Sequence, residues 1–80
     1  MFEVKEAVAR IARYYYSIRF LIGNNSDGDI EIRITGTHLG TGRDAGASQV
    51  ITPNNISRID MACERATQDL ICLGMKEDKS

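Results

Sequence analysis

The chain has 80 residues, of which 42% are apolar, 26% charged and 6% aromatic, and its formal net charge is −1. This length is too short for two domains of ordinary size. The ordinary apolar fraction and the small net charge argue against a disordered chain. A chain this short buries only about 60% of its unfolded surface, so we expect one domain that gains stability by self-association.

The first residues and the cysteines indicate a cytoplasmic protein without a membrane segment. Glu3 and Glu6 lie where a secretory signal would need an apolar run, and no apolar stretch approaches the roughly 20 residues that cross a bilayer. Cys63 and Cys72 fall in one predicted helix, about 13 Å apart along its axis. A disulfide within the chain is therefore excluded by distance, and we expect reduced thiols.

Apolar residues at the start of the chain recur at helical spacing and predict a helix over residues 3–15. The residues of this stripe are Val4, Ala7, Val8, Ile11 and Tyr15. Glu6 lies in the first turn, where a carboxylate interacts favourably with the helix dipole.

Two alternating segments, residues 17–23 and 29–36, predict a β-hairpin with one aliphatic and one polar face. The hydrophobic pattern leaves two strand registers open, because both keep the aliphatic side chains together. In one register Arg19 faces Arg33, which is destabilising unless something anionic lies nearby. In the other, Arg19 faces Glu31 and the charges are satisfied within the chain.

Residues 36–48 hold four of the seven glycines and predict a long loop, followed by a short third strand over 49–51. Loops of this length are usually functional or disordered. Glycines allow successive backbone N–H groups to converge on an anion, and Thr37, Thr41 and Arg43 add further donors. The glycine spacing matches neither the P-loop nor the dinucleotide-binding pattern.

The second predicted helix covers residues 53–73, with Thr52 as its N-cap and Pro53 as its first residue. Gly74 is expected to end it, and residues 75–80 are expected to form a charged, frayed tail. Apolar residues form a seam along this helix, namely Ile56, Ile59, Cys63, Ala66, Leu70 and Leu73.

These elements predict an α+β fold with the order α-β-β-(β)-α. Residues 1–74 form a single domain, in which both helices cover one face of a small antiparallel sheet in two layers. The apolar seams of the two helices have a larger surface than one hairpin can cover. We therefore expect a homodimer or a higher oligomer that associates through helix faces.

The residues that metal binding and catalysis would need are sparse. The chain has one histidine and two cysteines, fewer than the four closely spaced ligands of a structural zinc site. His38, Asp44 and Ser48 all fall in the predicted loop, but a mobile loop does not preorganise a catalytic set. We predict no metal, no cofactor and no catalytic activity.

The charge also argues against duplex nucleic acid as a partner. The sequence pI is about 5.7, whereas a duplex binder normally carries a basic patch. The order of elements resembles a double-stranded RNA-binding domain in outline. That family opens its second helix with a glycine and a lysine pair, and the matching stretch here, Ala47-Ser48-Gln49-Val50, has no lysine.

The leading hypothesis is a non-catalytic, oligomeric binding module for a small anionic ligand such as a nucleotide or a cyclic oligonucleotide. Arginines would pair with phosphates, hydroxyls would donate hydrogen bonds, and an aromatic ring would stack on a base. The residues predicted for these contacts are Arg19, Arg33, Arg43, Thr37, His38, Thr41 and Tyr16. The alternative is a small protein–protein interaction domain, an inhibitor or adaptor of the kind that phages and mobile elements encode.

Overall fold

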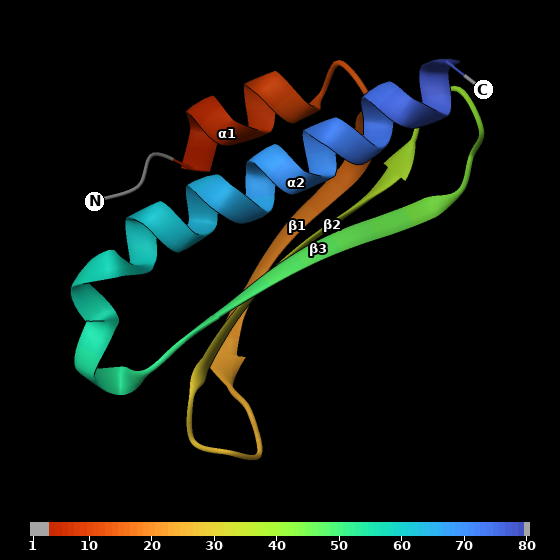
Figure 1. The fold of residues 1–80 in the computed structure, drawn as a ribbon. Coiled ribbons are helices and arrows are strands. Elements are labelled where there is room, and N and C mark those ends of the chain that lie inside the picture. Colours follow the sequence, from red (N-terminus) through yellow and green to blue (C-terminus); the bar gives the residue numbers. More distant parts are fainter. Residues whose placement is uncertain (1–3, 80) are drawn as a thin grey trace.

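The computed structural model describes residues 4–79 and has an N-terminal helix, a three-stranded antiparallel sheet and a C-terminal helix (Figure 1). The elements are α1 (Val4–Ile11), β1 (Tyr15–Asn24), β2 (Ile30–His38), β3 (Asp44–Ile51), a short 3-10 helix η1 (Pro53–Arg58) and α2 (Ile59–Lys79). The α+β fold with a small antiparallel sheet that the sequence predicts is confirmed.

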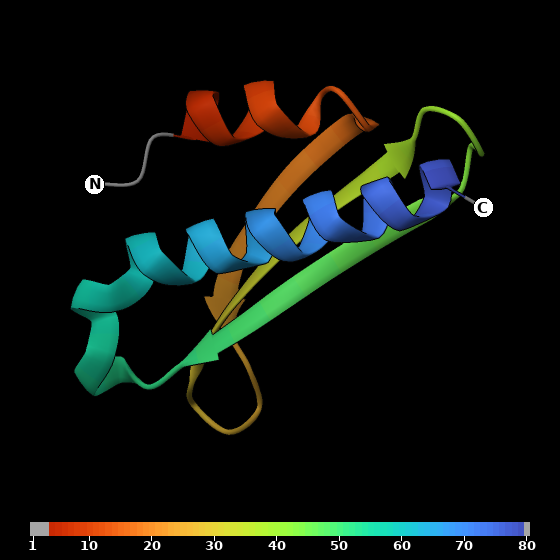
Figure 2. The same ribbon diagram turned by 45° about the horizontal axis from the view of Figure 1, so that its top comes forward.

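The sheet has the strand order β1-β2-β3, and both helices lie over the same face of it (Figures 1 and 2). α2 packs along β3 and β2, whereas α1 packs against α2 and lies near the start of β1. No element within residues 4–79 covers the opposite face. The molecule therefore has a covered face, which holds the core, and an uncovered face.

The core forms where alternate side chains of β2 meet the inner side of α2. Ile32 and Ile34 on β2 are fully buried, and Ala66 and Leu70 of α2 pack against this strand together with Ile11 of α1. Burial of aliphatic side chains such as these contributes about 1.5–3 kcal/mol each. The covered face therefore supplies most of the favourable free energy of folding.

The first helix ends four residues earlier than the sequence pattern predicts. α1 stops at Ile11, and the backbone N–H of Tyr14 donates to the carbonyl of Ile11 at 2.8 Å in the turn that follows. Tyr15 is buried as expected, but as the first residue of β1. Its ring meets the His38 ring edge-on with 5.5 Å between centroids. The stripe expected on a helix thus continues into the sheet.

The predicted loop over residues 36–48 is instead a second hairpin, which is the largest correction to the sequence analysis. β2 continues to His38, a short turn follows, and β3 spans Asp44–Ile51 in place of the three-residue strand expected. Gly36 lies within β2, where an added Cβ would lie 2.9 Å from the Cβ of Tyr15. Its missing side chain therefore allows close packing.

The register of the first hairpin differs from both predicted alternatives. Arg19 lies opposite Thr35, and Arg33 lies opposite Leu21. A β-bulge between Tyr16 and Arg19 shifts the pairing there. The expected opposition of Arg19 to Arg33 or Glu31 is therefore wrong, and no like-charge pair forms at this position.

The second helical region begins where the sequence predicts, since Thr52 is the N-cap residue and a proline opens the first turn. Its first six residues form η1 rather than α-helix. Ile56 and Leu73, at the two ends of the predicted seam, are 51% and 41% exposed. The packed seam is therefore shorter than predicted and centres on Cys63, Ala66 and Leu70.

Gly74 does not end the second helix, because α2 continues through the predicted tail to Lys79. The residue is buried, and a Cβ added there would lie 2.8 Å from the Cβ of Tyr14 and 3.0 Å from Cε2 of Tyr15. Gly74 thus lets α2 approach the turn between α1 and β1 closely.

Candidate functional site

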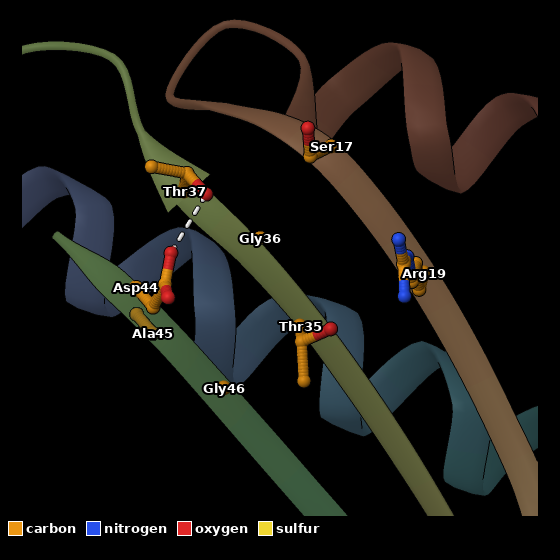
Figure 3. Close-up of a pocket in the computed structure, with 8 residues that line it drawn as sticks. All are labelled: Ser17, Arg19, Thr35, Gly36, Thr37, Asp44, Ala45 and Gly46. Atoms are coloured by element: carbon orange, nitrogen blue, oxygen red, sulfur yellow. Dashed lines mark hydrogen bonds between the residues drawn. The ribbon is translucent and has the colours of Figure 1, made fainter. Parts of the chain in front are cut away.

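A shallow depression of about 530 Å³ lies on the uncovered face of the sheet, at the end where β1 begins (Figure 3). All three strands contribute to it. The residues that line it are Ser17, Arg19, Thr35, Gly36, Thr37, Asp44, Ala45 and Gly46. Its volume exceeds the volumes of three other surface depressions, which are about 310, 270 and 250 Å³.

Strand alternation places the polar side chains of the depression on one face. The register sets Arg19 opposite Thr35, and Thr37 opposite Asp44. Arg19 and Asp44 belong to the outer strands with β2 between them, so their backbones are separated by on the order of 10 Å. Figure 3 shows them on opposite sides of the depression.

Ser17 has a strained backbone at the edge of this depression. Its φ is 53°, and it is the one non-glycine residue within residues 4–79 with a positive φ. The left-handed conformation costs a side-chain-bearing residue roughly 1–2 kcal/mol. Strain of this kind concentrates at binding and catalytic sites, where the surrounding structure holds it in place. The strained bulge therefore singles out this end of the uncovered face.

The depression has one basic and one acidic side. The hydroxyl of Thr37 donates to a carboxylate oxygen of Asp44 at 2.8 Å (dashed in Figure 3). The Arg19 side chain is exposed and forms no ion pair with another residue of the described part of the chain. A guanidinium that no carboxylate neutralises is free to take a ligand anion.

Three of the predicted binding residues lie together at this site. Arg19 and Thr37 line the depression. Tyr16 lies opposite Thr37 in the sheet and is 50% exposed. Ser17 and Thr35 also line the depression, although the sequence did not predict them as binding residues. The alternation of polar with aliphatic residues along β2 was the signal that could have located Thr35.

The other predicted residues lie elsewhere. Arg33 is on the uncovered face outside the depression, where its guanidinium pairs with Glu31 at 2.6 Å. Thr41 and Arg43 lie in the turn between β2 and β3, and the backbone N–H of Arg43 donates to the Thr41 hydroxyl. This turn is outside the depression as well.

His38 faces the helices and is 2% exposed. Its Nδ1 accepts the backbone N–H groups of Gly40 and Thr41 at 3.2 and 3.1 Å. Nε2 must then carry the hydrogen, which it donates to the carbonyl of Gly74 at 3.3 Å. The imidazole ties the β2–β3 turn to α2, and a ring so enclosed does not offer a face to a ligand.

Both cysteines are free thiols, as the sequence predicts. Cys63 is buried and Cys72 is exposed. Burial raises the pKa of the Cys63 thiol above its ordinary value, and the neighbouring carboxylate of Asp60 raises it further. Cys63 therefore stays protonated at neutral pH and belongs to the core.

Within residues 4–79, no group of three or more histidine, cysteine or acidic side chains lies close enough together to hold a metal ion. No helix in this part of the chain combines the length and the apolar character that a membrane span requires.

Comparison of the chain with protein families, with curated proteins and with solved structures gave no match.

Proposed function

We propose that the protein is a non-catalytic binding module for a small ligand that carries an anionic group at one end and a hydrogen-bond donor at the other, such as a nucleotide. The observation that carries this proposal is the strained Ser17 next to the Arg19 guanidinium on the uncovered sheet face.

The basic side of the depression suits a phosphate or carboxylate. Arg19 presents a planar fork of N–H donors, which fits either group in a bidentate arrangement. The hydroxyls of Ser17 and Thr35 border the same side and supply neutral donors (Figure 3). These groups surround the position expected for the anionic end of the ligand.

The acidic side suits a hydrogen-bond donor such as the amino group of a base. Asp44 is an acceptor, and its bond from the Thr37 hydroxyl orients it. Tyr16, beside Thr37, offers an exposed ring on which a base can stack. In a nucleotide the sugar separates the base from the phosphate, which matches the separation of the two sides of the depression.

The same geometry supports the non-catalytic part of the proposal. Ser17 is the candidate nucleophile in the depression, and the acidic residue Asp44 is two strands away. The imidazole of His38 points to the other face of the sheet. Within residues 4–79 no base adjoins the Ser17 hydroxyl, and the Thr37 hydroxyl, which donates to Asp44, has no histidine on its face of the sheet. A location in the cytoplasm stays a prediction from the sequence.

Isothermal calorimetry with AMP, ATP, cyclic di-AMP and inorganic pyrophosphate tests the proposal. We expect at least one nucleotide to bind, and Arg19→Gln to weaken it by about 10- to 100-fold, as the loss of a charge-assisted hydrogen bond of about 1.5–3 kcal/mol implies. Arg33→Gln is the matched control, because Glu31 already engages that guanidinium, and we expect its affinity to be unchanged.

Asp44→Asn separates a nucleotide site from a simple anion site. If Asp44 accepts a donor of the ligand, this variant weakens nucleotide binding. If the site takes only phosphate, removal of the carboxylate strengthens pyrophosphate binding, because a repulsive charge is gone. A folded protein that binds none of the four compounds contradicts the proposal.

A second candidate function is a protein–protein interaction domain. The observation in its favour is that Leu21 and Val50 are each 53% exposed on the uncovered face, outside the depression, where a small ligand would not cover them. If the calorimetry shows no ligand, a protein partner on this face becomes the preferred hypothesis.

A further inference from the structure

β1 is an edge strand, and its second half extends beyond the helices. In Figures 1 and 2, α1 lies near the start of β1, and the far end of β1 runs clear of both helices. Leu21 and Ile22 there are 53% and 54% exposed. Leu21 is on the uncovered face, and Ile22 is on the face that the helices cover elsewhere. This segment, residues 19–24, therefore exposes an apolar side chain on each of its two faces.

The hairpin turn fixes which backbone groups of this segment are free. The N–H of Asn25 donates to the carbonyl of Asp29 at 2.9 Å, so this pair occupies a hydrogen-bonding position of the ladder, although the N–H of Asp29 donates to Oδ1 of Asn25 rather than to its carbonyl. Such pairs alternate along an antiparallel ladder. Phe20, Ile22 and Asn24 therefore direct their N–H and C=O groups to the open edge of the sheet.

We propose that β1 of a second copy of this chain adds to this edge, antiparallel and related by a two-fold axis at Leu21. Phe20 then forms a hydrogen-bonded pair with Ile22 of the second copy, and Leu21 lies opposite Leu21 of the second copy. The two three-stranded sheets become one six-stranded sheet. Such an isologous interface is the commonest route to a soluble dimer.

The chemistry of the segment favours a second copy as the occupant. Natural edge strands are protected by charged side chains, prolines, bulges or shortness. β1 has ten residues with neither lysine nor proline, and its bulge lies between Tyr16 and Arg19, before the apolar residues 20–22. The one charged residue in the segment, Arg19, falls opposite Gly23 of the second copy, so no like charges meet. A register shifted by two residues toward the hairpin turn would place Phe20 opposite Asn24 and would pair fewer apolar side chains, and the opposite shift would place Arg19 opposite Leu21.

Charge complementarity points the same way. In the proposed register the hairpin tip of the second copy, which carries Asp27 and Asp29, extends past Ile18 toward the turn that joins α1 to β1. Arg13 in that turn is exposed. The acidic tip of each copy therefore approaches a basic residue of the other.

The proposed edge contact differs from the helix-face contact expected from the sequence, since it uses the strand that the helices leave uncovered.

Sedimentation equilibrium tests the interface with a matched pair of variants. Leu21 and Val50 have the same exposure of 53% and the same face, but they lie on the two opposite edge strands. We expect the native chain to have twice its mass of 8.9 kDa, Leu21→Lys to be a monomer, and Val50→Lys to remain a dimer. Circular dichroism checks that both variants fold.

Cross-linking tests the register. Residues at a non-hydrogen-bonded position have Cα atoms about 4.5 Å apart, within disulfide range. In a Cys72→Ser background we expect Leu21→Cys to form a disulfide dimer on mild oxidation and Val50→Cys to stay a monomer. A monomeric native chain throughout the micromolar range overturns the proposal. A dimer that stays intact in the Leu21→Lys variant but dissociates in the Leu73→Lys variant also overturns the proposal.

Discussion

The two faces of the sheet differ although they alternate along the same strand. On β2, Ile32 and Ile34 are fully buried beneath the helices, while the neighbouring Thr35 and Thr37 line an open depression. The residues that stabilise the fold and those proposed to bind a ligand point in opposite directions. Substitutions on the uncovered face should therefore leave stability largely unchanged, and substitutions on the covered face should leave the ligand affinity of the folded protein largely unchanged.

The largest expected difference is in stability. Ile34→Ala removes a fully buried side chain and should lower the free energy of unfolding by about 2–5 kcal/mol. Thr35→Ala, the next residue on the other face, should change it by no more than about 0.5 kcal/mol. Urea denaturation monitored by circular dichroism measures both. Equal losses would show that the uncovered face also contributes to the core.

Gly74→Ala tests how closely α2 must approach the covered face. Alanine favours helix over glycine by about 1 kcal/mol, but the new Cβ would lie 2.8 Å from the Cβ of Tyr14. We expect overpacking to prevail, with a net destabilisation of about 1–3 kcal/mol. Gly23→Ala is the control, since nothing lies within 4 Å of its added Cβ. A more stable Gly74→Ala protein would contradict the close approach.

Ser17→Gly tests the strain on the uncovered face. Glycine adopts the φ of 53° that Ser17 shows without steric cost, so the free energy of unfolding should rise by about 1 kcal/mol. Loss of the hydroxyl should at the same time weaken ligand binding in calorimetry. A variant that loses stability would show that the serine side chain supports the bulge, and the functional interpretation of the strain would then fail.

The smallest effect concerns the thiols and pH. The raised pKa of Cys63 means that the folded state holds this proton more tightly than the unfolded state. Its contribution to stability is constant at neutral pH and declines as the pH rises past the ordinary thiol pKa of about 8.5. Cys63→Ala should flatten this decline.

The reactivity of the two thiols tests the burial of Cys63. With Ellman's reagent, Cys72 should react at once and Cys63 only on unfolding. Immediate reaction of both thiols would contradict the burial of Cys63.

Local patterns in the sequence were sufficient to predict the helices, the first hairpin and the two-layer arrangement. They failed at the glycines, because glycine can have two opposite structural roles. Gly36 and Gly42 looked alike in sequence, yet Gly36 allows a close contact within β2 and Gly42 takes a φ of 70° in a tight turn. Composition does not distinguish a glycine that loosens the chain from one that lets it pack closely.

The candidate site was only partly accessible to sequence reasoning for a related reason. Arg19 and Thr37 were predicted, but their association with Asp44 depends on β3, whose length was missed. The bulge at Ser17 also shifts the register, and an alternating aliphatic pattern does not encode where a bulge occurs. The burial of His38 depends on contact with Gly74, which is 36 residues away. Local sequence patterns do not encode such a distant contact, so His38 was predicted to be an accessible loop residue.

The most direct test of the proposed binding face is an NMR titration of the ¹⁵N-labelled protein with ATP. The account predicts that the amide signals of residues 17–19, 35–37 and 44–46 shift together, while those of the turn from Leu39 to Arg43 and of α2 stay in place. Shifts confined to that turn or to α2, or no shifts at all, would contradict it.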